Sequence, residues 1–304
     1  MPSIENTRGS QAVNNDNPHD HEIIWVDDYA LNDLYSRPSL TSYLRSIWSR
    51  RHYIFADTKR RSLQGGEGTL LGRSWILLTP AIDSALYIFV FGFLMKVSRG
   101  MDNYVGFLVL GVVFYRVLTA GLTAGSGAIQ ASRGFITAFS FPRASVLISS
   151  ALRRTIDHAP AVVIAVIVAS IFQPSFKPTL SLLGIPFIYI GAQVFSLGFS
   201  LIIARITAFV PDVKRLVAFI VRGLFFVSGV FFSLDRFDSH PIIQKIVISN
   251  PIYQFLEAIR SCVLSGEFPN EFTTLYISAW SLGILIAGLW FFWRSEARYA
   301  NILS

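Results

Sequence analysis

The chain has 304 residues, of which 52% are hydrophobic and 15% charged, and its mean hydropathy is +0.50. Soluble domains carry about 25% charged residues, so this composition argues against a soluble enzyme, a disordered chain and a nucleic-acid-binding module. The net charge of +7 is expected of a membrane protein, whose cytoplasmic loops collect Lys and Arg. The single cysteine, Cys262, excludes an internal disulfide framework.

The N-terminal region divides into two parts. Residues 1–22 lack the apolar stretch of a signal peptide and are rich in Asn, Asp, Ser and Gln, so we expect residues 1–38 to form a disordered cytoplasmic tail. Residues 39–64 place apolar side chains at helical spacing among basic ones, which predicts an amphipathic helix. With Arg45, Trp48, Arg50 and Arg51 it fits an anionic membrane surface, the alternative being a helix packed on a soluble domain.

Residues 65–304 read as an all-α, polytopic membrane domain with six transmembrane helices. The apolar stretches lie at about residues 75–97, 104–127, 146–172, 179–210, 216–234 and 272–293. With both termini inside, 18 Lys and Arg lie on the inner side and six on the outer side, so both termini are expected in the cytoplasm.

Two connections between these stretches are unusually apolar. The inner loop 130–143 carries Phe135, Ile136, Phe139 and Phe141, which predicts a short helix that docks into a groove of a cytosolic partner. The outer segment 235–271 holds two short apolar pieces that begin at Pro241 and Pro251. Both are too short to span the hydrocarbon, so we expect re-entrant or interfacial helices before the last span.

The sequence lacks the motifs of catalysis. Residues 67–74 imitate a phosphate-binding loop, but Glu67 replaces its first Gly and Arg73 replaces its Lys. Neither H-E-x-x-H nor G-x-S-x-G occurs. We therefore expect no catalytic residue, metal site or cofactor in this chain, and energy for transport from a partner or an ion gradient.

Several short motifs, taken in order, resemble one family. They are GTLLG before the first span, FPR at the end of the inner loop, PDV before the fifth span, NP in the outer segment and the tail FWRSEARYANIL. Over residues 39–304 the chain resembles the permease subunit of type-2 ABC exporters of lipid-linked polysaccharides, which include O-antigen, teichoic acid and galactan. Its N-terminal region is most similar to that of actinobacterial members, which favours galactan.

The resemblance implies an assembly in the bacterial cytoplasmic membrane. Two permease copies would associate with two separate ATPase subunits, which would hold ATP and Mg, while membrane lipids and a polyprenyl-linked polysaccharide, but no nucleic acid, would be the other partners. The inner loop would be the coupling helix and the turn before the fifth span a second contact. Their residues are Gly134, Phe135, Ile136, Phe139, Phe141, Pro142 and Arg143, and Pro211, Asp212 and Lys214.

The resemblance also places a channel at the dimer axis, lined mainly by spans one and five. Aromatic faces suit sugar C–H groups, although most of the 26 Phe are expected to pack against lipid or neighbours. The aromatic candidates are Tyr87, Phe91, Tyr115, Phe225, Phe226, Phe231 and Phe232. Asp83, Arg116 and Arg222 are costly in hydrocarbon, so they either pair with each other or form a polar channel wall.

Two further patterns bear on packing and on an alternative function. Gly121 and Gly125 form G-x-x-x-G, which predicts close approach of two helices. Arg153, Arg154, Asp157 and His158 form the one polar cluster that could serve a membrane glycosyl- or phosphotransferase acting on a polyprenyl-linked sugar. That enzyme is the alternative to an exporter subunit.

Overall fold

The computed structural model describes residues 39–63, 74–87, 89–90, 103–132, 142–173, 179–237, 239–296 and 298–299, and the regular elements in these ranges are all helices. The N-terminal helices are α1 (Leu40–Ser49), α2 (Arg51–Leu63) and α3 (Trp75–Tyr87). The central ones are α4 (Tyr104–Gly125), α5 (Ala128–Ala131), α7 (Ala144–Ile171) and α8 (Gly184–Phe209), which follows the 3-10 helix Leu180–Leu183. The last are α9 (Val213–Val227), α10 (Pro241–Ile248), α11 (Pro251–Arg260) and α12 (Glu271–Trp293), with a 3-10 helix at Leu234–Phe237 and a π-helix at Ser261–Ser265.

Four helical segments are long and apolar enough to cross a membrane, which makes the chain a polytopic membrane protein. They are Tyr104–Gly125, Ala144–Ile171, Leu180–Phe209 and Glu271–Trp293, and they match the second, third, fourth and sixth predicted spans. The first predicted span begins as α3, and most of its second half lies outside the described residues. The fifth is shorter than predicted, because α9 ends at Val227 and Gly229 adopts a φ of 72° in the turn that follows.

The predicted single helix over residues 39–64 is wrong in one respect, because it divides into α1 and α2 at Arg50. Ser39 caps α1 by accepting a hydrogen bond from the backbone N–H of Ser42 at 3.3 Å. Helix α2 packs along α7, where the hydroxyl of Thr58 donates to the carbonyl oxygen of Ser149 at 3.2 Å. The N-terminal helices are therefore attached to the bundle at one end of α7.

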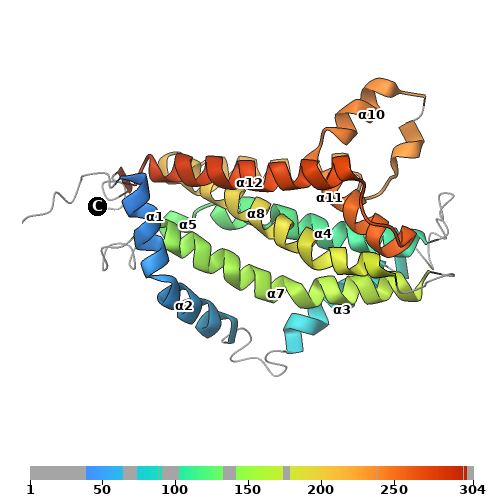
Figure 1. Cartoon of the computed structure of the whole chain (residues 1–304), viewed down its shortest axis with the longest axis horizontal. Coiled ribbons are helices and arrows are strands. Elements are labelled where there is room, and N and C mark those ends of the chain that lie inside the picture. The colour runs from blue at the N-terminus through green and yellow to red at the C-terminus, as the bar shows by residue number, and fades with distance from the viewer. Residues whose placement is uncertain are drawn as a thin grey trace, which may run out of the picture. The chain divides into compact units, whose positions relative to one another are not determined.

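Glycines bring α4, α8 and α12 into close contact, and Figure 1 shows these helices side by side. A Cβ atom at Gly121 would lie 1.7 Å from the carbonyl oxygen of Ser196, and one at Gly288 would lie 2.5 Å from that of Gly198. Such distances leave no room for a side chain, so the backbones touch directly. The close approach predicted from Gly121 and Gly125 is confirmed, and its partner is α8.

The two short helices before α12 begin with proline as predicted, but their surroundings differ. Helix α10 is exposed, with 75% of Ile242 accessible. Helix α11 is buried against α4 and α12, and its last residue, Arg260, is 3% exposed. The Arg260 guanidinium donates to the carbonyl oxygens of Phe107, Gly229 and Val230 at 2.9–3.3 Å. Arg260 thus joins α11 to α4 and to the turn after α9.

Candidate functional site

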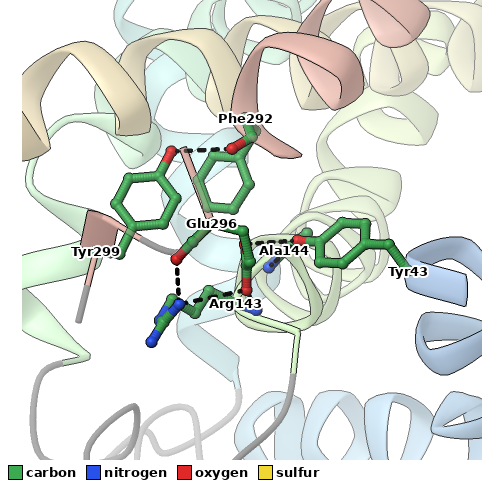
Figure 2. A network of polar contacts seen from close by, with 6 residues as sticks. All are labelled: Tyr43, Arg143, Ala144, Phe292, Glu296 and Tyr299. Atoms are coloured by element: carbon green, nitrogen blue, oxygen red, sulfur yellow. Dashed lines mark hydrogen bonds and ion pairs between the residues drawn. The ribbon is translucent and has the colours of Figure 1, made fainter. Parts of the chain in front are cut away.

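A buried polar network lies where α8 and α12 end and α7 begins, and it is centred on Glu296 (Figure 2). The Glu296 carboxylate accepts hydrogen bonds from the hydroxyl of Tyr43 at 2.9 Å and from the backbone N–H of Arg143 at 2.8 Å. The Arg143 guanidinium lies 3.6 Å from the same carboxylate and also donates to the Glu296 carbonyl oxygen. We call Tyr43, Arg143, Ala144, Phe292, Glu296 and Tyr299 the Glu296 network.

The network joins three parts of the chain that are far apart in sequence. Tyr43 comes from α1, Arg143 and Ala144 from the start of α7, Phe292 from the end of α12, and Glu296 and Tyr299 from the residues after it. The backbone N–H of Ala144 donates to the Tyr43 hydroxyl at 3.3 Å, and the Tyr299 hydroxyl donates to the Phe292 carbonyl oxygen at 3.3 Å (Figure 2). Movement of any one of these parts therefore strains the others.

Burial raises the pKa values of two groups in this network. Glu296 is 6% exposed, and burial raises the pKa of its carboxyl group above the usual value, with Arg143 and the Tyr43 hydroxyl opposing the shift. Burial also raises the pKa of Tyr43 well above its usual value, and the charge of Glu296 adds to this effect. These shifts concern the two groups that share the hydrogen bond from the Tyr43 hydroxyl to the Glu296 carboxylate.

The sequence indicated some members of this network and missed others. Arg143 was expected at the end of the coupling helix, but Tyr43 was counted as an apolar position of the amphipathic helix. Glu296 was part of the tail motif FWRSEARYANIL without a role. The available signal was an acidic residue directly after a charge-free span, since such a residue needs a partner near the membrane boundary.

The expected contacts with an ATPase divide between described and undescribed residues. Gly134, Phe135, Ile136, Phe139 and Phe141 lie outside the described residues. Pro142 and Arg143 follow them, and Arg143 belongs to the Glu296 network. Pro211, Asp212 and Lys214 are exposed at the turn between α8 and α9, with the Lys214 ammonium 3.7 Å from the position a Cβ atom would take at Gly127.

The charges inside the predicted spans are partly paired. The guanidinium of Arg116 on α4 forms an ion pair with the carboxylate of Asp83 on α3, so Asp83 pairs with Arg116 rather than with Arg222 within the described residues. The side chains of this pair remain 55% and 31% exposed, and Arg222 is exposed on α9. An exposed charge in a membrane helix needs a polar cavity or a partner surface.

A second group of charges lies on α7. Arg153 donates from Nε to the Asp157 carboxylate at 3.1 Å. The neighbouring Arg154 Nε and Nη2 and His158 Nδ1 atoms are buried and have no hydrogen-bond partner among the described residues.

The aromatic candidates gather where α4 meets α9 and the turn that follows. Tyr115 is 4% exposed and its hydroxyl donates to the carbonyl oxygen of Val221. Its ring lies 5.0 Å from that of Phe225, which lies 5.0 Å from that of Phe231. Phe226 is 66% exposed. Phe232 packs against Phe237 at 5.2 Å, and the Tyr87 side chain and Phe91 lie outside the described residues.

The remaining candidates lie on the surface of α1 and beside it. Arg45, Trp48, Arg50 and Arg51 are exposed, with 70% of Trp48 accessible. The Arg51 guanidinium lies 5.6 Å from the centre of the Trp48 ring and donates to the Trp48 carbonyl oxygen at 3.4 Å. An exposed tryptophan with adjacent arginines has the composition that suits a membrane surface.

The fold defines a class of protein, a polytopic helical membrane protein with four candidate membrane spans. Comparison with known families is consistent with this class. Residues 60–264 match the model of the ABC-2 type transporter, and the chain belongs to this family. It is a permease subunit, and the ATPase in this family is a separate subunit.

Individual relatives extend over most of the chain. The O-antigen export system permease protein RfbA of Klebsiella pneumoniae is 26% identical over 78% of this chain and 89% of its own length. The protein of the same name from Myxococcus xanthus is 20% identical over 85% of this chain and 98% of its own length. The polysialic acid transport protein KpsM of Escherichia coli is 20% identical over 72% and 84%.

Proposed function

We propose that this chain is the membrane subunit of an ATP-driven exporter of a lipid-linked polysaccharide. The observation that carries the proposal is the similarity to O-antigen export permeases, which extends over 78% of this chain and 89% of the relative. A galactan is the polymer we favour, because the N-terminal region resembles actinobacterial members of the group. The substrate would be attached to a polyprenyl lipid and would move outward.

The proposed assembly contains two copies of this chain and two ATPase subunits, which bind ATP and Mg. Residues 134–143 and the turn Pro211–Lys214 would contact the ATPase. The exposure of Pro211, Asp212 and Lys214 supports this assignment. The Glu296 network supports it as well, because Arg143, directly after the proposed coupling helix, is held by a buried carboxylate.

The proposed channel lies between the two copies and is lined by α3 and α9. Arg116, Arg222 and Phe226 are exposed in a single copy although they belong to apolar helices. A second copy facing them would enclose these charges in a polar passage, which removes the cost of exposing them to lipid. The Asp83–Arg116 pair would then form part of the passage wall.

We further propose that the chain resides in the bacterial cytoplasmic membrane with both termini in the cytoplasm. The support is the distribution of Lys and Arg, with 18 on the inner and six on the outer side. Residues 1–38 would be a cytoplasmic tail, residues 39–64 would lie on the membrane surface, and residues 65–304 would form a six-span domain with re-entrant helices before the last span.

Depletion of the protein in its native cell tests the proposal. Membrane lipids would be extracted and analysed by mass spectrometry for polyprenyl-linked glycans. We expect a full-length glycan to accumulate on its lipid, with sugar masses that identify the polymer. Accumulation of truncated intermediates would instead place the protein in synthesis and would favour a membrane glycosyl- or phosphotransferase.

A further inference from the structure

A groove separates α8 from α12 near the start of both helices. It encloses about 470 Å³ and is lined by residues of α8 from Gly184 to Val194 and of α12 from Thr274 to Leu282, together with Phe268 and Pro269. Glycine at 184 and 191 and the small residues Thr274 and Ser278 leave the space open. Phe187 and Leu282, at 77% and 58% exposed, stand at its edges.

Three of the residues that line the groove carry hydroxyl groups, and each of these hydroxyls already donates a hydrogen bond within the protein. The Thr274 hydroxyl donates to the carbonyl oxygen of Asn270 at 3.0 Å, and that of Ser278 to the carbonyl oxygen of Thr274 at 2.7 Å. The Ser281 hydroxyl lies 2.6 Å from the carbonyl oxygen of Ile277 and 3.0 Å from that of Gly191. Among the residues that the structure describes, no charged side chain lines the groove. Its chemistry therefore suits a hydrocarbon and excludes a charged head group.

The length of the groove points to one leaflet of a membrane. Ten residues of α8 separate Gly184 from Val194, which corresponds to about 15 Å along a helix at about 1.5 Å per residue. A bilayer core is about 30 Å thick, so about 15 Å is the depth of one leaflet. Both walls are candidate membrane spans, so the medium that surrounds this groove is hydrocarbon.

We infer that the groove binds one acyl chain of a membrane phospholipid. An empty space of this size would leave its lining without dispersion contacts, whereas a chain lying along it restores them. The groove lies between α8 and α12, and the candidate channel residues lie on α3, α4, α9 and the turn after α9. The occupant is therefore a lipid of the surrounding leaflet rather than the exported one. In the orientation proposed above this is the outer leaflet.

Photolabelling in vesicles tests this inference with the full chain and its ATPase present. The probe is phosphatidylglycerol with a diazirine in the middle of one acyl chain, and labelled residues are mapped by mass spectrometry. Ser278→Phe fills the groove, and Ala279→Phe is the matched control, because Ala279 is the next residue, is exposed and is absent from the lining. We expect labelling of residues 184–194 and 268–282 to fall about tenfold in Ser278→Phe and to be unchanged in Ala279→Phe.

Three results would overturn the inference. Equal labelling in both variants would mean ordinary contact with surrounding lipid. Stronger labelling by a polyprenyl phosphate diazirine, at the same membrane fraction, would assign the groove to the exported lipid. Absence of label from the groove would overturn the inference, and a crosslink between two copies at these residues would assign the groove to a second protomer. The labelling requires no transport, so it succeeds or fails independently of the proposed function.

Discussion

The hydroxyl of Tyr43 donates a 2.9 Å hydrogen bond to the carboxylate of Glu296, a residue 253 positions away in the chain. The bond fastens α1 to the residues that follow α12. Because the same carboxylate binds the backbone N–H of Arg143, the segment before α7 is held at the same point. In the proposed assembly this point adjoins the contact with the ATPase.

Glu296→Ala should destabilise the protein. The substitution removes the acceptor of two hydrogen bonds and leaves the partly buried Arg143 guanidinium without its carboxylate, which costs about 2–3 kcal/mol. Thermal unfolding of the purified protein measures the change. Glu271→Ala is the control, because Glu271 is exposed at the start of α12 and should change stability by about 0.5 kcal/mol or less. Equal losses in the two variants would contradict a structural role for the Glu296 network.

The stability should also depend on pH in a direction set by Glu296. Burial raises its pKa in the folded state above the usual value of 4.5. Its contribution is therefore fully present below the unfolded pKa and is lost as pH rises through the folded pKa. The stability of the wild type relative to Glu296→Gln should fall as pH rises from about 4.5 through the folded pKa. A difference that grows with pH would show that the ion pair with Arg143 outweighs burial.

Some of this architecture could be predicted from the sequence and some could not. Hydropathy located four spans within about two residues, because α4, α7, α8 and α12 are long and predominantly apolar. The end of α9 at Val227 was missed, because a single glycine with positive φ decides it.

The contacts of polar side chains were the harder part. Arg260 is one of the six basic residues that the sequence assigns to the outer side, and the structure shows its side chain buried in the protein. Its partners are the backbone carbonyls of Phe107, Gly229 and Val230, which no residue pattern reveals. Tyr43 was missed for a similar reason, since its bond to Glu296 depends on how the two ends of the chain meet.

Gly121→Ala should weaken the contact between α4 and α8. The added methyl group would lie 1.7 Å from the carbonyl oxygen of Ser196, so the helices must separate, at a cost of about 1–3 kcal/mol. Gly283→Ala is the control, because nothing lies within 4 Å of its added Cβ atom. The fraction of folded protein after titration with a denaturing detergent measures both variants. A harmless Gly121→Ala would contradict the close packing of α4 on α8.

Exchanging the charges of Asp83 and Arg116 in one double variant should restore the folded protein that each single reversal loses. Each single reversal places two like charges next to each other between α3 and α4, which destabilises this contact. We expect each of Asp83→Arg and Arg116→Asp to reduce the amount of folded protein in membranes. The double variant should recover most of it, as measured by a double-mutant cycle. Additive losses would show that the two residues act separately.

The central claim is that this permease moves a lipid-linked polysaccharide across a membrane under the control of ATP. The direct measurement uses vesicles that contain the permease with the ATPase that co-purifies with it and the lipid-linked glycan from depleted cells. A glycosidase on one side reports whether the glycan crosses. The account predicts that the glycan changes sides only with hydrolysable ATP and that Glu296→Ala slows this movement. A glycan that stays in place with ATP, while its lipid linkage or sugar chain is altered, would contradict the account.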